Sequence, residues 1–339
     1  MNETNSPSGR RLEPSAATTS ALSAANRSSV AGRVAVCTLA GSMLLALGAG
    51  CQKAPAAAGA QAASPRASNA TSPSAHVADT GSTETKKVFM KISESGNGRN
   101  ILVLHGGGGP ATMAGLAAHL AQHAHVITPT HPGWDGTPRP ESLDNVAALA
   151  DEYVRYLDDH DLNNVLVVGS SLGGWLGAEI ALRDTAHRVT GLVIINGVGV
   201  NIAGHPITNI SQFTPPQIAK VAFHDPAKFG AGAPPPTPER IAMMRANQET
   251  LAVFAGDPYC YDPTLLGRVK AIDIPTLVLW GESDHVATKE YGRGYAAAIP
   301  NARFELVAEA GHLPWLEQPA ETFAKLDHFV AATAAAGHR

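Results

Sequence analysis

The most informative run in this chain is Val165-Leu-Val-Val-Gly169-Ser170-Ser171-Leu172-Gly173-Gly174. An apolar strand pattern leads into Gly-x-Ser-x-Gly, and helical spacing of apolar residues begins directly afterwards. A strand that turns at once into a helix leaves room only for glycines around the serine, so the serine hydroxyl is exposed at the end of the strand. The helix start also directs free backbone N–H groups toward developing negative charge. We therefore predict that Ser171 is a nucleophile, and the alternative is a glycine-rich turn with an incidental serine.

Short apolar runs alternate with helical patterns on both sides of this turn. The expected strands are 88–92, 100–104, 125–129, 165–168, 191–195, 275–280 and 302–307. The expected helices are 111–122, 145–159, 172–183, 288–299 and 320–334. This alternation predicts an α/β fold with a doubly wound, mostly parallel sheet.

One segment, residues 197–270, breaks this rhythm. It carries many prolines, with helical patches near 216–223 and 238–254. Because the segment is too long for a loop between two sheet strands, we expect a helical cap insertion that covers the carboxyl edge of the sheet. Such a cap is also expected to influence which substrate enters.

The composition along the chain predicts three regions. The chain has 339 residues and a formal net charge of −4, with 44% hydrophobic and 16% charged residues. This composition is unlike that of a disordered polyampholyte and lacks the basic excess of a nucleic-acid-binding protein. An apolar run lies within residues 1–51, and residues 52–85 are rich in Pro, Ala, Ser and Thr. We predict a signal-type leader over 1–51, a flexible linker over 52–85 and one domain over 86–339.

The leader ends in a pattern of small residues, Leu47-Gly48-Ala49-Gly50-Cys51. This pattern resembles a bacterial lipoprotein signal, in which the cysteine is lipidated and becomes the new N-terminus. The resemblance implies an exported bacterial protein that a lipid on Cys51 anchors to a membrane of the cell envelope. A secreted or periplasmic protein is the second choice.

A second glycine run, His105-Gly106-Gly107-Gly108-Gly109-Pro110, follows the expected strand 100–104. In a loop without side chains, backbone N–H groups can approach a carbonyl oxygen that becomes an oxyanion. We expect the N–H of Gly107 to be the loop donor, with Gly108 as the second choice, and the N–H of Leu172 to be its partner.

The same glycines also fit a dinucleotide-binding fingerprint. That fingerprint requires an acidic residue about 20 positions later, at the end of the next strand. The sequence reads Thr128-Pro129-Thr130-His131 there, so we expect no nucleotide cofactor. We also expect no metal, because the histidines are not spaced as metal ligands usually are. We interpret His131, His205, His224 and His285 as loop residues.

Two later strands end in residues that complete a catalytic set. The strand 275–280 leads to Asp284, and the strand 302–307 leads to His312. Because ligands of parallel sheets bind at the carboxyl ends of the strands, we expect Ser171, Asp284 and His312 to meet there. Ser171 would attack a carbonyl, His312 would take and return its proton, and Asp284 would hold the imidazole tautomer. Glu282 and Glu309 are the alternative acids.

Taken in order over residues 100–335, these motifs resemble the α/β-hydrolase superfamily. The resemblance depends on His105-Gly-Gly, Thr130-His131-Pro132-Gly133-Trp134-Asp135-Gly136, Gly169-Ser-Ser-Leu-Gly-Gly, Trp280-Gly-Glu-Ser-Asp284, Gly311-His312 and Glu317-x-Pro319. It implies a capped, esterase-like enzyme with a serine nucleophile, which needs no cofactor and acts on a small, partly apolar acyl substrate. The serine argues against the haloalkane dehalogenases and epoxide hydrolases of the superfamily, which use an aspartate there.

Three functions remain open from the sequence. The first is a serine hydrolase that cleaves a carboxylic ester or related acyl bond. The second is a carbon–carbon bond hydrolase of the same superfamily, which the predicted export disfavours because ring-cleavage products arise in the cytoplasm. The third is a non-catalytic surface binding protein on the same fold, which the complete set of Ser171, Asp284 and His312 disfavours. The oligomeric state is left open.

Overall fold

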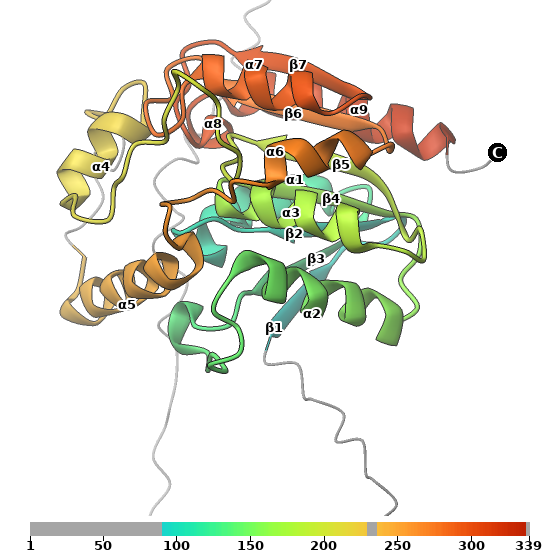
Figure 1. Ribbon diagram of the computed structural model, residues 1–339, viewed down its shortest axis with the longest axis horizontal. Coiled ribbons are helices and arrows are strands. Elements are labelled where there is room, and N and C mark those ends of the chain that lie inside the picture. The colour runs from blue at the N-terminus through green and yellow to red at the C-terminus, as the bar shows by residue number, and fades with distance from the viewer. Residues whose placement is uncertain (1–89, 229–235, 337–339) are drawn as a thin grey trace, which may run out of the picture. The chain divides into compact units, whose positions relative to one another are not determined.

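The computed structural model describes residues 90–228 and 236–336, and Figure 1 shows their arrangement. Within these residues, seven strands form one sheet in the order β1-β3-β2-β4-β5-β6-β7. The strands are β1 Lys91–Ser95, β2 Asn100–Leu104, β3 His125–Thr130, β4 Val165–Ser170, β5 Val189–Ile195, β6 Thr276–Gly281 and β7 Ala302–Val307. All neighbouring pairs are parallel except β1 and β3. The predicted fold class is confirmed. The predicted leader and linker lie outside the described residues.

Helices cover both faces of the sheet (Figure 1). The α-helices are α1 Ala114–Leu120, α2 Val146–Asp159, α3 Leu172–Arg183, α4 Pro215–Ala222, α5 Pro238–Ala255, α6 Leu265–Arg268, α7 Lys289–Ala298, α8 Pro314–Glu317 and α9 Pro319–Ala336. The short 3-10 helices are η2 Pro110–Met113, η3 Trp134–Gly136 and η4 Val269–Ala271. Of the described helices, none is long and apolar enough to cross a membrane.

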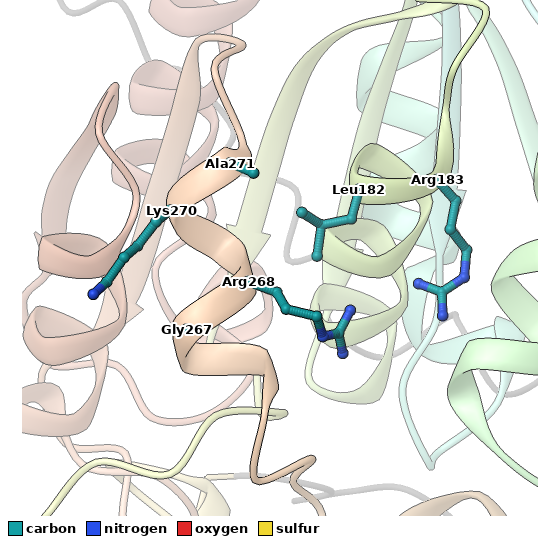
Figure 2. Close-up of a pocket in the computed structure, with 6 residues that line it drawn as sticks. All are labelled: Leu182, Arg183, Gly267, Arg268, Lys270 and Ala271. Atoms are coloured by element: carbon teal, nitrogen blue, oxygen red, sulfur yellow. The ribbon is translucent and has the colours of Figure 1, made fainter.

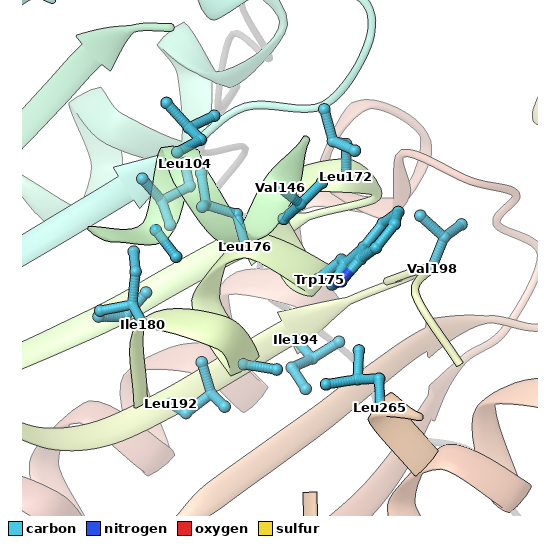
Figure 3. Close-up of a cluster of buried hydrophobic side chains, with 14 of the residues drawn as sticks. Leu104, Val146, Leu172, Trp175, Leu176, Ile180, Leu192, Ile194, Val198 and Leu265 are labelled. Atoms are coloured by element: carbon cyan, nitrogen blue, oxygen red, sulfur yellow. The ribbon is translucent and has the colours of Figure 1, made fainter. Parts of the chain in front are cut away.

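The central strands are buried on both faces, which explains their continuous apolar sequences. Every residue of β4 is buried, and its side chains alternate between two hydrophobic clusters. Val167 packs in the cluster that α2, α3 and α7 close, and Val168 packs in the cluster that α1 and α9 close. Figure 3 shows part of the first cluster, where Leu176 and Ile180 of α3 lie close to residues of β5. The sheet therefore holds the ends of β4, β5 and β6 in fixed register.

The first strand differs from the expected one. The sequence predicts a strand over 88–92, whereas β1 runs from Lys91 to Ser95 and pairs antiparallel with β3. Most of β1 is exposed, and its residues after Ile92 are polar. The pairing of an exposed edge strand depends on backbone hydrogen bonds, so its sequence need not alternate between apolar and polar residues. The residue at which such a strand ends therefore cannot be predicted from the sequence.

The segment between β5 and β6 contains the two expected helices, α4 and α5. Helix α5 lies beside η3, which follows β3. The last part of the same segment, α6 and η4, lies instead beside α3 and leads into β6 (Figure 2). The predicted cap over 197–270 thus includes a stretch that packs on the body of the sheet.

Candidate active site

Ser171 occupies a strained turn between β4 and α3. Its backbone has φ 56° and ψ −119°, a conformation that non-glycine residues seldom adopt. A Cβ on Gly169 would lie 2.0 Å from the Gly173 carbonyl oxygen, and one on Gly173 would lie 2.2 Å from the Leu104 carbonyl oxygen. Both positions therefore require glycine. The observed turn is the one that the Gly-x-Ser-x-Gly pattern predicts, with the first N–H groups of α3 directly after the serine.

Asp284 and His312 form a buried hydrogen-bonded pair. The Nδ1 atom of His312 lies 2.8 Å from Oδ2 of Asp284. Oδ1 of Asp284 accepts hydrogen bonds from the N–H groups of Val286 at 2.8 Å and Ala287 at 3.3 Å. Because a carboxylate only accepts hydrogen bonds, Nδ1 of His312 carries the proton and Nε2 is left as the acceptor. The structure thus brings together two of the three predicted catalytic residues directly.

The end of β5 connects the turn at Ser171 to the pair of Asp284 and His312 by hydrogen bonds. The N–H of Ser171 donates to the carbonyl of Ile195 at 3.1 Å, and Asn196 follows immediately. Nδ2 of Asn196 donates to Oδ2 of Asp284 at 2.6 Å. All three predicted residues therefore lie at the carboxyl edge of the sheet, after β4, β6 and β7, with the end of β5 between the serine and the pair. The serine–histidine contact stays a prediction.

The alternative acids lie elsewhere. Glu282 is on the surface, where its carboxylate is 3.1 Å from Nζ of Lys289. Glu309 is exposed, and its carbonyl accepts a hydrogen bond from Gln318. Asp284 is accordingly the better-placed acid of the three.

Asn196 is a site residue that the sequence analysis missed. It is fully buried, and its side chain uses both ends: Nδ2 donates to Asp284, and Oδ1 accepts from the N–H of Gly281 at 3.2 Å. Its φ of 47° is left-handed, a conformation that asparagine tolerates better than most residues. An isolated asparagine after a strand carries no motif, so no sequence signal marked it.

We expect Asn196→Gly to weaken both the fold and the site. Glycine accepts the left-handed backbone, so the substitution removes mainly the amide and leaves the N–H of Gly281 without its acceptor. The free energy of unfolding should fall by about 1–3 kcal/mol, and kcat should fall about tenfold if one hydrogen bond to Asp284 contributes roughly 1.4 kcal/mol. Urea unfolding and ester kinetics measure these effects. His187→Gly, at an exposed residue that also has a positive φ, is the matched control and should change kcat little.

The glycine loop after β2 has both of its central peptides oriented by hydrogen bonds. The carbonyl of Gly106 accepts from Nδ1 of His105 at 2.7 Å and from the N–H of Gly109 at 3.1 Å. The carbonyl of Gly107 accepts from Nε1 of Trp134 at 3.0 Å. In a trans peptide the next N–H points the opposite way, so the N–H groups of Gly107 and Gly108 both point away from these donors. The choice between them as the oxyanion donor stays a prediction.

This loop also lies against the serine turn. A Cβ built on Gly106 would be 2.9 Å from Cβ of Ser171 and 3.5 Å from its Oγ. The loop can approach so closely only because it carries no side chain at this position. The predicted donors of the loop and of Leu172 therefore belong to adjacent backbone segments.

The model of the Alpha/beta hydrolase family matches residues 101–326. The chain belongs to the α/β hydrolase family. This result confirms the resemblance drawn from the motifs, and it agrees with the sheet and the serine turn described above.

Individual members of the family are similar to this chain at low identity. The 2-hydroxy-6-oxo-6-(2'-aminophenyl)hexa-2,4-dienoic acid hydrolase of Metapseudomonas resinovorans is 26% identical, over 70% of this chain and 85% of that protein. Lipase 3 of Moraxella sp. is 25% identical, over 70% of this chain and 78% of that protein. A thermophilic esterase from Thermogutta terrifontis shares the fold, with a TM-score of 0.56 at 22% identity, over 72% of this chain and 93% of that protein.

Two buried histidines support the glycine loop of this α/β hydrolase. Nε2 of His105 accepts a hydrogen bond from the N–H of His131 at 3.1 Å. His131 donates from Nε2 to the carbonyl of His105 at 3.1 Å, and its Nδ1 is 2.5 Å from the hydroxyl of Tyr153. Burial lowers the pKa of His105 to about 4 and the pKa of His131 well below its usual value, so both rings are neutral near pH 7. His131 is a loop residue, as predicted, but its complete burial was not foreseen.

The burial of His105 predicts a pH dependence of stability. Because its pKa falls from 6.5 to about 4 on folding, the unfolded chain binds more protons at this site between those values. The free energy of unfolding should therefore fall as the pH drops from about 6.5 to 4, by on the order of 3 kcal/mol for this group. Measured by urea unfolding, the His105→Gln variant should be less stable than the parent at pH 7.5. Its free energy of unfolding should decline less than that of the parent between pH 6.5 and pH 4. A variant that declines as steeply as the parent would contradict the assignment.

Glu317 is a second residue whose role only the structure reveals. Its carboxylate accepts hydrogen bonds from the N–H groups of Gly311 at 2.7 Å, His224 at 3.1 Å and Asp225 at 3.1 Å. The side chain thereby joins the loop that carries His312 to the chain that leaves α4. The sequence analysis used Glu317 only as part of a family motif.

A basic pocket lies away from the candidate catalytic residues (Figure 2). It is lined by Leu182, Arg183, Gly267, Arg268, Lys270 and Ala271. Arg183 terminates α3, about 18 Å along the helix from Ser171. Both arginines form ion pairs with the buried carboxylate of Glu179. Their charge therefore serves the packing of α6 on α3, and the pocket is not part of the candidate active site.

Two further observations concern metals and thiols. Within residues 90–228 and 236–336, no cluster of three or more His, Cys, Asp or Glu side chains could hold a metal ion. Cys260 is buried, and burial raises the pKa of its thiol to about 12. A thiol in that state is not a nucleophile at neutral pH.

Proposed function

We propose that this α/β hydrolase is a serine hydrolase that cleaves a carboxylic ester or related acyl bond through an acyl-enzyme intermediate. The observation that carries the proposal is the 2.8 Å bond between His312 and Asp284, at the same edge of the sheet as the strained turn of Ser171. Esterases and lipases among its relatives are consistent with this reaction.

In the first half of the reaction, Oγ of Ser171 attacks the acyl carbon while Nε2 of His312 takes its proton. Asp284 stabilises the imidazolium through Nδ1 and does not itself become protonated. The oxyanion is stabilised by the N–H of Leu172 and by a loop N–H from Gly107 or Gly108. His312 then gives its proton to the leaving alcohol.

In the second half, water attacks the acyl-enzyme. His312 takes a proton from the water and returns it to Oγ of Ser171 as the acid leaves. The reaction consumes water and needs no cofactor.

A carbon–carbon bond hydrolase is the second candidate. Two relatives bear names of this reaction class, the Metapseudomonas resinovorans hydrolase and a 2-hydroxymuconate semialdehyde hydrolase of Pseudomonas putida that is 27% identical over 264 residues. A hydrolase of this class cleaves a carbon–carbon bond of a ring-cleavage product, whereas an esterase accepts simple esters.

A fluorophosphonate probe followed by a substrate panel tests the proposal. The parent should be labelled at Ser171 and should hydrolyse p-nitrophenyl esters, and Ser171→Ala should not be labelled. Hydrolysis of a carbon–carbon bond in a ring-cleavage product, but of no ester, would favour the second candidate. Absence of labelling and of any hydrolysis would leave the non-catalytic binding protein.

We also propose, from the sequence pattern that ends at Cys51, that the enzyme is exported and anchored by a lipid on this cysteine. The full-length protein expressed in bacteria should partition with membranes, and Cys51→Ala should release it. Mass spectrometry of an unmodified Cys51 with Met1 retained would contradict this proposal.

A further inference from the structure

One face of the cap helix α5 packs on the loops beside the serine turn. Four residues at helical spacing, Asn247, Thr250, Leu251 and Phe254, make these contacts. A Cβ on Gly107 would lie 2.5 Å from Cδ2 of Leu251, and Oγ1 of Thr250 donates to the carbonyl of Gly133 at 3.0 Å. In contrast, Ile241 and Met244 near the start of the helix are 54% and 43% exposed. The second half of α5 is therefore the part that is bound to the body.

Asn247 is the polar contact of this face and is only 4% exposed. Its Oδ1 accepts from the N–H of Asp135 at 2.8 Å, and its Nδ2 donates to Oδ1 of Asp135 at 2.9 Å. Asp135 has a left-handed backbone with φ 49°, which costs free energy for a residue with a Cβ. The paired hydrogen bonds with Asn247 stabilise that conformation.

Trp134, the neighbour of Asp135, extends the connection to the glycine loop. Its Nε1 donates to the carbonyl of Gly107 at 3.0 Å, and its ring centroid is 5.3 Å from that of Phe254 on α5. The fully buried ring is attached to the backbone beside Asp135, so a shift of the backbone at residues 134 and 135 would move Nε1 relative to the Gly107 carbonyl. The Gly107 carbonyl in turn determines where the N–H of Gly108 points.

From these contacts we propose that Asn247 is a positioning residue, through which the cap helix α5 holds Trp134 and thereby the peptide that joins Gly107 to Gly108. On this proposal the loop donor of the oxyanion hole is the N–H of Gly108, because this N–H shares its peptide with the carbonyl that Trp134 holds. The inference rests on the proposed serine hydrolase function. It couples the contacts of α5 to formation of the oxyanion hole, because without Asn247, Asp135 loses both hydrogen bonds and the Trp134 donor to the Gly107 carbonyl is no longer held.

A reciprocal exchange of the two side chains tests the proposal. Asn247→Asp places two carboxylates together and removes the Nδ2 donor. We expect kcat to fall roughly 10²-fold, at the lower end of the loss of one oxyanion donor, with KM changed less than about threefold. In the double variant Asn247→Asp/Asp135→Asn, an amide again faces a carboxylate, and asparagine suits the left-handed backbone. Its kcat should return to within about fivefold of the parent.

The indole N–H of Trp134 gives a readout that does not require activity. In ¹H–¹⁵N spectra of the full enzyme, with Trp134→Phe for assignment, this proton should exchange with solvent faster in Asn247→Asp and at the parental rate in the double variant. Met244→Ala, on the exposed part of α5, is the control and should change neither kcat nor exchange.

The outcomes separate the two proposals. If the parent hydrolyses no ester, the proposed function fails, and the exchange of Trp134 still tests the link between α5 and the loop. If Asn247→Asp keeps the parental exchange and kcat, or if the double variant recovers neither, the positioning role is wrong. Should Asn247→Asp fail to fold, Asn247→Ala, which removes both hydrogen bonds without adding charge, takes its place with the same expected loss and the same readouts.

Discussion

Ser171→Ala and His312→Ala should each lower kcat by roughly 10⁵–10⁶, if the two residues act with Asp284 as one unit. Alanine at 171 leaves no nucleophile, and alanine at 312 leaves no base to take the serine proton. The double variant should be little worse than either single variant, because both residues serve the same step. Steady-state hydrolysis of the best p-nitrophenyl ester, with active-site titration by the fluorophosphonate, measures the effect.

Two controls accompany this experiment. Ser171→Ala should keep the parental unfolding midpoint, because this side chain lies outside the hydrophobic clusters. His312→Ala should lower the free energy of unfolding by about 1–3 kcal/mol, because it removes a hydrogen-bond partner of the buried Asp284, and its kcat is therefore measured where the enzyme is fully folded. Ser170→Ala changes the buried serine that ends β4, next to Ser171. It tests whether the loss of kcat is specific to Ser171 or follows from removing either serine. A Ser171→Ala enzyme that keeps most of its rate would end the serine hydrolase proposal.

Asp284→Asn should lower kcat by about 10⁴ while the fold stays intact. The carboxylate accepts the Nδ1 proton of His312 at 2.8 Å, which keeps Nε2 free to act as a base. An amide that orients its NH₂ group toward Nδ1 favours the opposite tautomer, in which Nε2 already carries the proton. The backbone N–H groups of Val286 and Ala287 favour this orientation, because both donate to the Oδ1 position and so require the amide oxygen there. The NH₂ group then takes the Oδ2 position, where it faces Nδ1 of His312 and also the Nδ2 donor of Asn196.

Glu282→Gln is the matched control for the acid. It makes the same chemical change two residues away, at a side chain that pairs with Lys289 on the surface, and kcat should change less than about threefold. If Asp284→Asn stayed active while Ser171→Ala and His312→Ala did not, Glu309 would be the next acid to test.

The sequence predicted the parts of this enzyme that depend on local geometry. The turn at Ser171 follows from a strand, two glycines and a helix start, because steric exclusion acts between residues only a few positions apart. The doubly wound, mostly parallel sheet and the edge at which Asp284 and His312 lie follow from the alternation of buried strands and amphipathic helices. The family and the fold class were therefore accessible before any coordinates.

Only the tertiary structure identified the residues that hold the site in place. Asn196 reaches Asp284 across 88 positions of sequence, and Asn247 reaches Asp135 across 112. A buried amide that satisfies a distant partner has no periodicity and no neighbouring motif, so its sequence resembles that of any loop or helix asparagine. Its role arises when folding removes water from both partners and leaves each as the hydrogen-bonding group of the other.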